Sequence, residues 1–127
     1  MSELSRQRAA LWERCDGLCE VSGRPLDYET FDMHHRRNKG MGGTSRPNTD
    51  ALYNLLALDP EIHNGGPTSV HGRRDWSEAN GFLIPKNADY PQQWPVKLRA
   101  RWWVLLPATP GYVPIPRSLV ESRNFVH

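Results

Sequence analysis

Cysteine is scarce in this chain, since Cys15 and Cys19 are its only two cysteines. Two thiols are too few for the disulfide framework of a small secreted protein. The chain also lacks a run of about eighteen apolar residues, which a transmembrane helix would need. Residues 1–6 do not show a charged segment followed by an apolar one, so we expect no signal peptide and a cytoplasmic protein.

A large excess of charge is also missing, because the formal net charge is only +2. The charge is unevenly distributed, however, and the segment 34–50 carries the bases Arg36, Arg37, Lys39 and Arg46. A basic cluster of this kind suits a phosphodiester substrate. A solvated loop with ordinary surface arginines fits the same residues about equally well, so charge alone does not identify a function.

Histidine and asparagine occur in an ordered pattern near the middle of the chain. His34 and His35 are adjacent, a glycine-rich segment follows at 39–44, Asn54 opens an apolar run, and His63 comes nine residues after it. This order resembles the HNH endonuclease family, and its form is similar to that of the small HNH proteins common in phages. The resemblance covers about a third of the chain.

The resemblance implies a separate role for each matched residue. His34 and His63 would be metal ligands, His35 would be the general base, and Asn54 would hold the loop backbone and so orient His35. Adjacent residues of a strand point to opposite faces, so the two neighbouring histidines cannot share one task. A neutral imidazole with a pKa near about 6.5 is a competent base at cellular pH. The expected cofactor is one divalent metal ion, either Mg, Mn, Ni or Zn.

The third protein ligand is not at its usual place. Many members of the family have another histidine four residues after the one that His63 matches, and this chain has Pro67 there. The next histidine is His71, which we take as a displaced ligand. Asp32 is a weaker candidate, because its side chain is expected on the same strand face as that of His34.

A structural zinc is common in the family, where two Cys-x-x-Cys pairs hold it. In this chain Cys19 is followed by Ser22 at the position of the second thiol, and residues 59–62 contain no thiol. Tetrahedral zinc needs about four strong ligands. We therefore expect no structural zinc, and we expect apolar packing around Ile62 to replace it.

Periodicity and turn residues predict the secondary structure. We expect helices at 3–15 and 69–80, with a helix of about one turn after Asp59. The expected strands are 18–21, 31–36, 82–84, 96–99, 101–106 and 111–113. Residues 37–53 form a predicted loop, the apolar stretch 52–58 is a buried strand or turn, and the tail 117–127 is a loose helix or disordered.

The sequence predicts an α+β protein with one domain over residues 1–127. By the resemblance, it has a small ββα-metal core at about 18–81, a flanking N-terminal helix, and a strand-rich extension at 82–116 that contains a β-hairpin region. The implied activity is metal-dependent hydrolysis of DNA, which leaves a 5′-phosphate and a 3′-hydroxyl. Arg36, Arg37 and Lys39 would neutralise phosphates outside the cleavage site.

DNA is the expected partner. The resemblance to phage proteins implies the phage packaging machinery as a further partner. Two alternatives stay open. One is a non-catalytic DNA-binding accessory module on a degenerate HNH scaffold, although such a module has no use for the base His35. The other is a metal-binding structural protein that does not bind nucleic acid.

Overall fold

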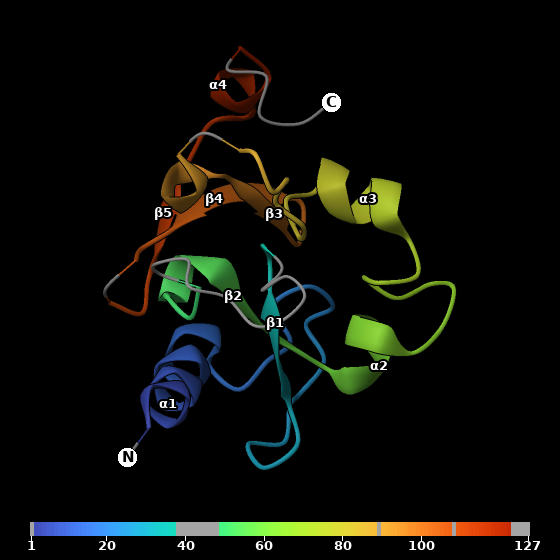
Figure 1. Ribbon diagram of the computed structural model, residues 1–127, viewed down its shortest axis with the longest axis vertical. Coiled ribbons are helices and arrows are strands. Elements are labelled where there is room, and N and C mark those ends of the chain that lie inside the picture. Colours follow the sequence, from blue (N-terminus) through green and yellow to red (C-terminus); the bar gives the residue numbers. More distant parts are fainter. Residues whose placement is uncertain (1, 38–48, 89, 108, 123–127) are drawn as a thin grey trace.

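The computed structural model describes residues 2–37, 49–88, 90–107 and 109–122 (Figure 1). It is a mixed α+β structure with an N-terminal helix and two antiparallel sheets. The helices are α1 (Glu3–Cys15), α2 (Pro60–Asn64), α3 (Arg74–Ala79) and α4 (Arg117–Ser122), with 3-10 turns η1 (Leu52–Asn54) and η2 (Pro91–Gln93). The strands are β1 (Asp32–His35), β2 (Leu55–Leu58), β3 (Val96–Leu98), β4 (Arg101–Leu105) and β5 (Tyr112–Pro114). No helix within these ranges has the length and apolar character that crossing a membrane requires.

Helix α1 has clear signals at both ends. The Ser2 side chain accepts a hydrogen bond from the Ser5 amide, which satisfies one of the free N–H groups of the first turn. At the other end Asp16 and Gly17 have positive φ angles of 55° and 74°, a conformation that stops a helix. The predicted helix at 3–15 is confirmed.

Strand β2 forms the centre of the protein, and all four of its residues are buried. Leu56 and Leu58 belong to one apolar cluster, together with residues of β3 and β4. Leu55 and Ala57 belong to a second cluster, which includes residues of α1. Side chains of a strand alternate between faces, so β2 packs on α1 with one face and on the C-terminal sheet with the other. Figure 1 shows β2 between these two layers.

Strand β1 pairs with β2 in an antiparallel arrangement that fixes the histidine pair. His34 is opposite Leu56 and His35 is opposite Leu55. The predicted strand at 31–36 is thus confirmed, with slightly shorter bounds. Helix α2 follows β2 directly, because Asp59 caps it by accepting a bond from the Glu61 amide and Pro60 occupies its first turn.

The second sheet has the strand order β3-β4-β5. It confirms the strands predicted at 96–99, 101–106 and 111–113. Arg99 and Ala100, which connect β3 to β4, both have positive φ angles of 49° and 73°. Tight two-residue hairpin turns require such angles.

A buried polar network joins α1, β2 and the C-terminal sheet. Arg14 and Glu20 form an ion pair at 2.7 Å, and both side chains are fully buried. Glu20 also accepts hydrogen bonds from the Ala57 amide and the Tyr112 hydroxyl. These bonds satisfy a carboxylate that would otherwise be costly to bury.

Three predicted elements differ from the structure. Residues 18–21 form only an isolated bridge between Leu18 and Pro25. Residues 82–84 are not a strand, although the Ile84 amide donates to the Arg36 carbonyl at 2.7 Å. The helix predicted at 69–80 starts only at Arg74, because the preceding backbone bonds back to α2. In the predicted tail, 117–122 is the helix α4.

Candidate metal centre

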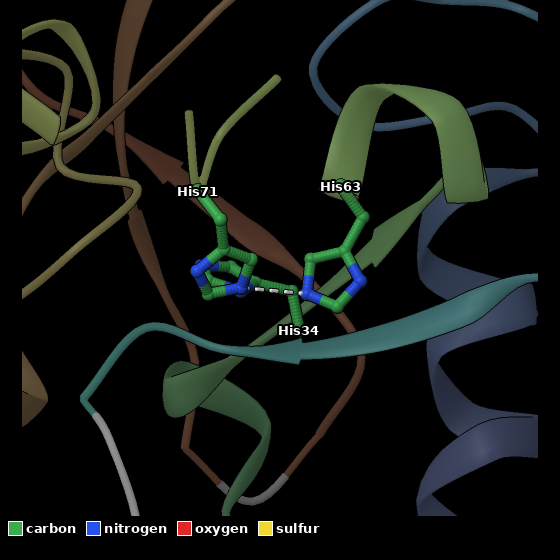
Figure 2. A group of neighbouring side chains, drawn as sticks. All are labelled: His34, His63 and His71. Atoms are coloured by element: carbon green, nitrogen blue, oxygen red, sulfur yellow. Dashed lines mark hydrogen bonds between the residues drawn. The ribbon is translucent and has the colours of Figure 1, made fainter. Parts of the chain in front are cut away.

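Three histidines from different segments meet beside the β1–β2 pair (Figure 2). His34 lies on β1, His63 on α2, and His71 in the turn before α3. One ring nitrogen of each can act as a ligand, and these atoms all lie within 4.8 Å of one another. The group can hold a metal ion, and it contains the three ligands that the sequence predicts.

His34 contributes its Nδ1 atom. Its Nε2 atom lies 2.6 Å from the carbonyl oxygen of Phe82. A carbonyl oxygen only accepts, so Nε2 must carry the proton and Nδ1 keeps its lone pair. Burial lowers the pKa of His34 to about 3, and only 1% of the residue is exposed. The imidazole is therefore neutral at cellular pH, which is the form that binds a metal.

His63 contributes its Nε2 atom. Its Nδ1 atom lies 2.9 Å from a carboxylate oxygen of Asp32. The carboxylate accepts the Nδ1 proton, which orients the ring and leaves the Nε2 lone pair for an ion. A metal-binding histidine commonly has such a partner. Asp32 therefore bonds to His63 and is not itself a member of the three-histidine group.

His71 reaches the site because the chain folds back after α2. The Val70 amide donates to the Ile62 carbonyl at 2.7 Å, and the His71 amide donates to the His63 carbonyl at 3.2 Å. Gly72 permits this close approach, since a Cβ there would lie 2.1 Å from the Gly66 oxygen. The reversal places His71 beside His63 without a helix between them.

The spacing of the His63 and His71 rings suits a shared ion. The Nε2 atoms of His63 and His71 lie 3.0 Å apart. Two imidazole nitrogens at about 2.0–2.1 Å from one metal are themselves roughly 3 Å apart in tetrahedral or octahedral geometry. Burial and the nearby His63 both lower the pKa of His71, which favours its neutral form.

His35 lies outside this group and bonds to another residue. Its Nε2 atom is 2.7 Å from the carboxylate oxygen Oδ1 of Asp50. A carboxylate accepts this proton and leaves Nδ1 as the basic nitrogen. Sequence reasoning missed Asp50, because nothing in its spacing from His35 indicated that the two side chains meet.

Asn54 is buried and holds the backbone on both sides of the segment 38–48. Its Oδ1 atom accepts from the Arg37 amide at 2.8 Å. Its Nδ2 atom donates to the Thr49 carbonyl at 2.7 Å and to the Arg37 carbonyl at 3.3 Å. One amide side chain therefore holds the backbone of Arg37 and that of Thr49 close together.

The two described residues of the basic cluster, Arg36 and Arg37, differ in how deeply they are buried. The prediction that Arg36 contacts phosphates is wrong, because only 1% of Arg36 is exposed and its guanidinium is engaged inside the protein. It donates to the carbonyl oxygens of Gly81, Tyr53, Trp94 and Pro95 at 2.8–3.0 Å. Burial lowers the pKa of Arg36 to about 9.

Arg37 is half-buried and donates to the Lys86 carbonyl. Its Nε atom is buried and has no hydrogen-bond partner among the described residues. Lys39 and the glycines at 40–43 lie outside the described residues.

Cys19 and Ile62 both take part in apolar packing. Cys19 is fully buried in the larger apolar cluster, and Ile62 packs against that cluster. The Ser22 amide lies 3.5 Å from the Cys19 sulfur. The thiol thus serves as part of the core.

The ligands of the candidate centre are three imidazoles, a donor set that suits zinc, nickel and other first-row metals. Three protein ligands leave at least one position for water or a substrate, as in catalytic metal sites. Comparison with protein-family models, characterised proteins and solved structures found no match to this chain.

Proposed function

We propose that this protein is a metal-dependent endonuclease of the HNH type that hydrolyses phosphodiester bonds of DNA. The observation that carries the proposal is the different surroundings of two adjacent histidines. His34 belongs to the three-histidine group, whereas His35 bonds to the carboxylate of Asp50. A hydrolase needs both a metal centre and a separate base, and a simple metal-binding site needs only the first.

The order of elements supports a ββα-metal core. Strands β1 and β2 are antiparallel neighbours, and α2 follows β2 after Asp59. Strand β1 carries both His34 and His35, and α2 carries His63. We propose that these three elements hold the centre in the same manner as in HNH nucleases.

His34, His63 and His71 would hold the metal. When bound there, a divalent ion supplies charge neutralisation at the scissile phosphate and at the leaving 3′ oxygen. The protein prepares this site through the Phe82 carbonyl and the Asp32 carboxylate, which orient two of the three rings.

His35 would take a proton from the attacking water. Asp50 accepts the Nε2 proton and so fixes the tautomer in which Nδ1 is the base. Asn54 would position this base, because the Arg36 amide donates to the Asn54 carbonyl at 2.7 Å and the Asn54 side chain holds the Arg37 backbone. The backbone directly after His35 is therefore anchored to Asn54, the residue that precedes β2.

Cleavage of supercoiled plasmid tests the proposal. The wild-type protein should nick or linearise the plasmid with at least one of Mg, Mn, Ni or Zn, and EDTA should stop it. His35→Ala, purified in the same way, is the matched control for a contaminating nuclease and should lose the activity while retaining the metal. Equal cleavage by both proteins, or none by either with any of the four metals, would refute the proposal.

A further inference from the structure

A cleft of about 430 Å³ lies next to the candidate metal centre. His71, one of the three grouped histidines, forms part of its lining. One wall is made by Arg74 and Glu78 of α3, and the other by the segment 83–87. The volume falls in the range of sites that take a small molecule or one unit of a polymer.

The second wall is attached to the strand that carries His34. The Phe82 carbonyl accepts from His34, the Ile84 amide donates to the Arg36 carbonyl, and the Lys86 carbonyl accepts from the Arg37 side chain. These three bonds tie residues 82, 84 and 86 to residues 34, 36 and 37, which belong to β1 or follow it. The cleft therefore keeps a set position relative to the metal centre.

The lining contains both apolar and charged residues. Leu83, Ile84 and Pro85 supply apolar surface, and Lys86 and Arg74 supply positive charge. Glu78 is the one acid of the lining, and it pairs with Arg74 at 2.9 Å, so neither Lys86 nor Arg36 has an acidic partner in the lining. A nucleotide has the complementary properties: flat apolar base faces, polar base edges and an anionic phosphate.

We propose that this cleft seats one unpaired nucleotide of the substrate strand, next to the phosphate that lies at the histidines. This inference rests on the proposed nuclease function and narrows its substrate class. A base inside a duplex must leave its stack and its partner to enter such a cleft, and this costs least for a base that is already single-stranded. The preferred substrate is therefore a single strand, an overhang or a frayed junction.

Binding of fluorescent oligonucleotides, measured by anisotropy in EDTA so that nothing is cut, tests the inference. The wild-type protein should bind a single strand about tenfold more tightly than the duplex of the same sequence. Leu83→Glu places a carboxylate in the cleft and should remove this preference. Lys86→Ala should reduce the slope of log affinity against log salt by about 0.7, the value for one lost phosphate contact on a single strand.

Two matched variants control for general effects of charge. Val113→Glu puts the same carboxylate on an exposed position of β5, and Lys97→Ala removes a lysine of β3. Both should bind as the wild type does. Equal losses in the control and cleft variants, a single-strand preference that Leu83→Glu does not change, or a wild type that prefers the duplex would overturn the inference.

The plasmid assay separates this inference from the proposed function. If the wild type cleaves DNA but the cleft variants keep wild-type binding and strand preference, the enzyme stands and the cleft is not its nucleotide site. If the wild type neither cleaves nor binds nucleic acid, both proposals fall. Lys86 is exposed, so its variant retains the fold even if Leu83→Glu does not.

Discussion

The Nε2 atoms of His63 and His71 lie 3.0 Å apart although the residues are eight positions apart and separated by a Gly-Gly-Pro sequence. In a regular helix, positions eight residues apart are separated by about 12 Å along the axis, so a continuous helix would not bring the two rings together. The contact depends on the backbone reversal that bonds Val70 and His71 back to α2. The relationship predicts that both histidines bind the same ion.

Removal of a ligand should weaken the metal site strongly. His63→Ala should abolish measurable binding of zinc or nickel, because it removes both a ligand and the partner of Asp32. His71→Ala should leave a two-histidine site whose affinity is lower by at least about a hundredfold. Isothermal titration calorimetry on the two variants and the wild type measures these losses. Wild-type affinity in His71→Ala would show that His71 is not a ligand.

Asp32 should influence metal affinity only indirectly, by orienting the ring of His63. Asp32→Asn keeps the size of the side chain but weakens its acceptance of the Nδ1 proton, so metal affinity should fall by about tenfold to a hundredfold. The same titrations measure this effect, with Asp27→Asn as a control at an exposed carboxylate. A loss as large as that in His63→Ala would instead indicate that Asp32 itself binds the ion.

The proposed base and its partner should affect cleavage without affecting the metal. His35→Ala should lower the rate of plasmid cleavage by about 10²–10⁴, the usual contribution of a general base. Asp50→Asn should give a smaller loss, because the ring keeps a hydrogen-bond partner but not a charged acceptor. Single-turnover rates at saturating metal, together with calorimetry, separate the two effects. A parallel loss of metal affinity in His35→Ala would mean that the roles of His34 and His35 are reversed.

Acid should destabilise the metal-free protein through His34. Burial holds the pKa of the folded form at about 3, whereas the ordinary value is 6.5. Between these values the unfolded chain binds a proton that the folded chain does not, so this contribution is fully present above pH 6.5 and is lost as the pH falls. One such proton gives a slope of about 1.4 kcal/mol per pH unit.

Urea unfolding in EDTA at several pH values from 7 to 4.5 measures this slope. His34→Gln has no titrating group at this position, so its stability should fall less steeply with acid than that of the wild type. Equal slopes in the two proteins would show that His34 is not buried in its neutral form.

Replacing Arg36 should destabilise the fold more than replacing its neighbour Arg37. Arg36→Ala leaves several buried carbonyls without a donor, so the free energy of unfolding should fall by about 3 kcal/mol or more. Arg37 is only half-buried, and Arg37→Ala should be milder. Urea unfolding of both variants measures the difference. A mild effect of Arg36→Ala would contradict the structural role that its four carbonyl partners indicate.

Much of the fold could be predicted from the sequence because its signals are local. The cap at Ser2, the stop at Asp16-Gly17 and the spacing of apolar residues define α1, and Asp59-Pro60 defines the start of α2. The apolar alternation also indicated the strands of the C-terminal sheet. The order of His34, His35, Asn54 and His63 indicated a division of roles among the polar residues.

Other features were decided only by the tertiary structure, because they depend on contacts between distant residues. A strand pattern cannot show that Arg36 turns inward to carbonyls of three other segments while Arg37 stays nearer the surface. Spacing alone also does not reveal that Asp50 reaches His35.

The position of His71 illustrates the same limit. Its residue type made it a candidate ligand, but whether it met His63 depended on how the chain reversed after Gly65 and Gly66. The reversal is set by hydrogen bonds to Ile62 and His63 and by the absence of a Cβ at Gly72. The sequence by itself determined which side chains could bind a metal, and the tertiary structure decided which of them share a site, because only packing brings separate segments within bonding distance.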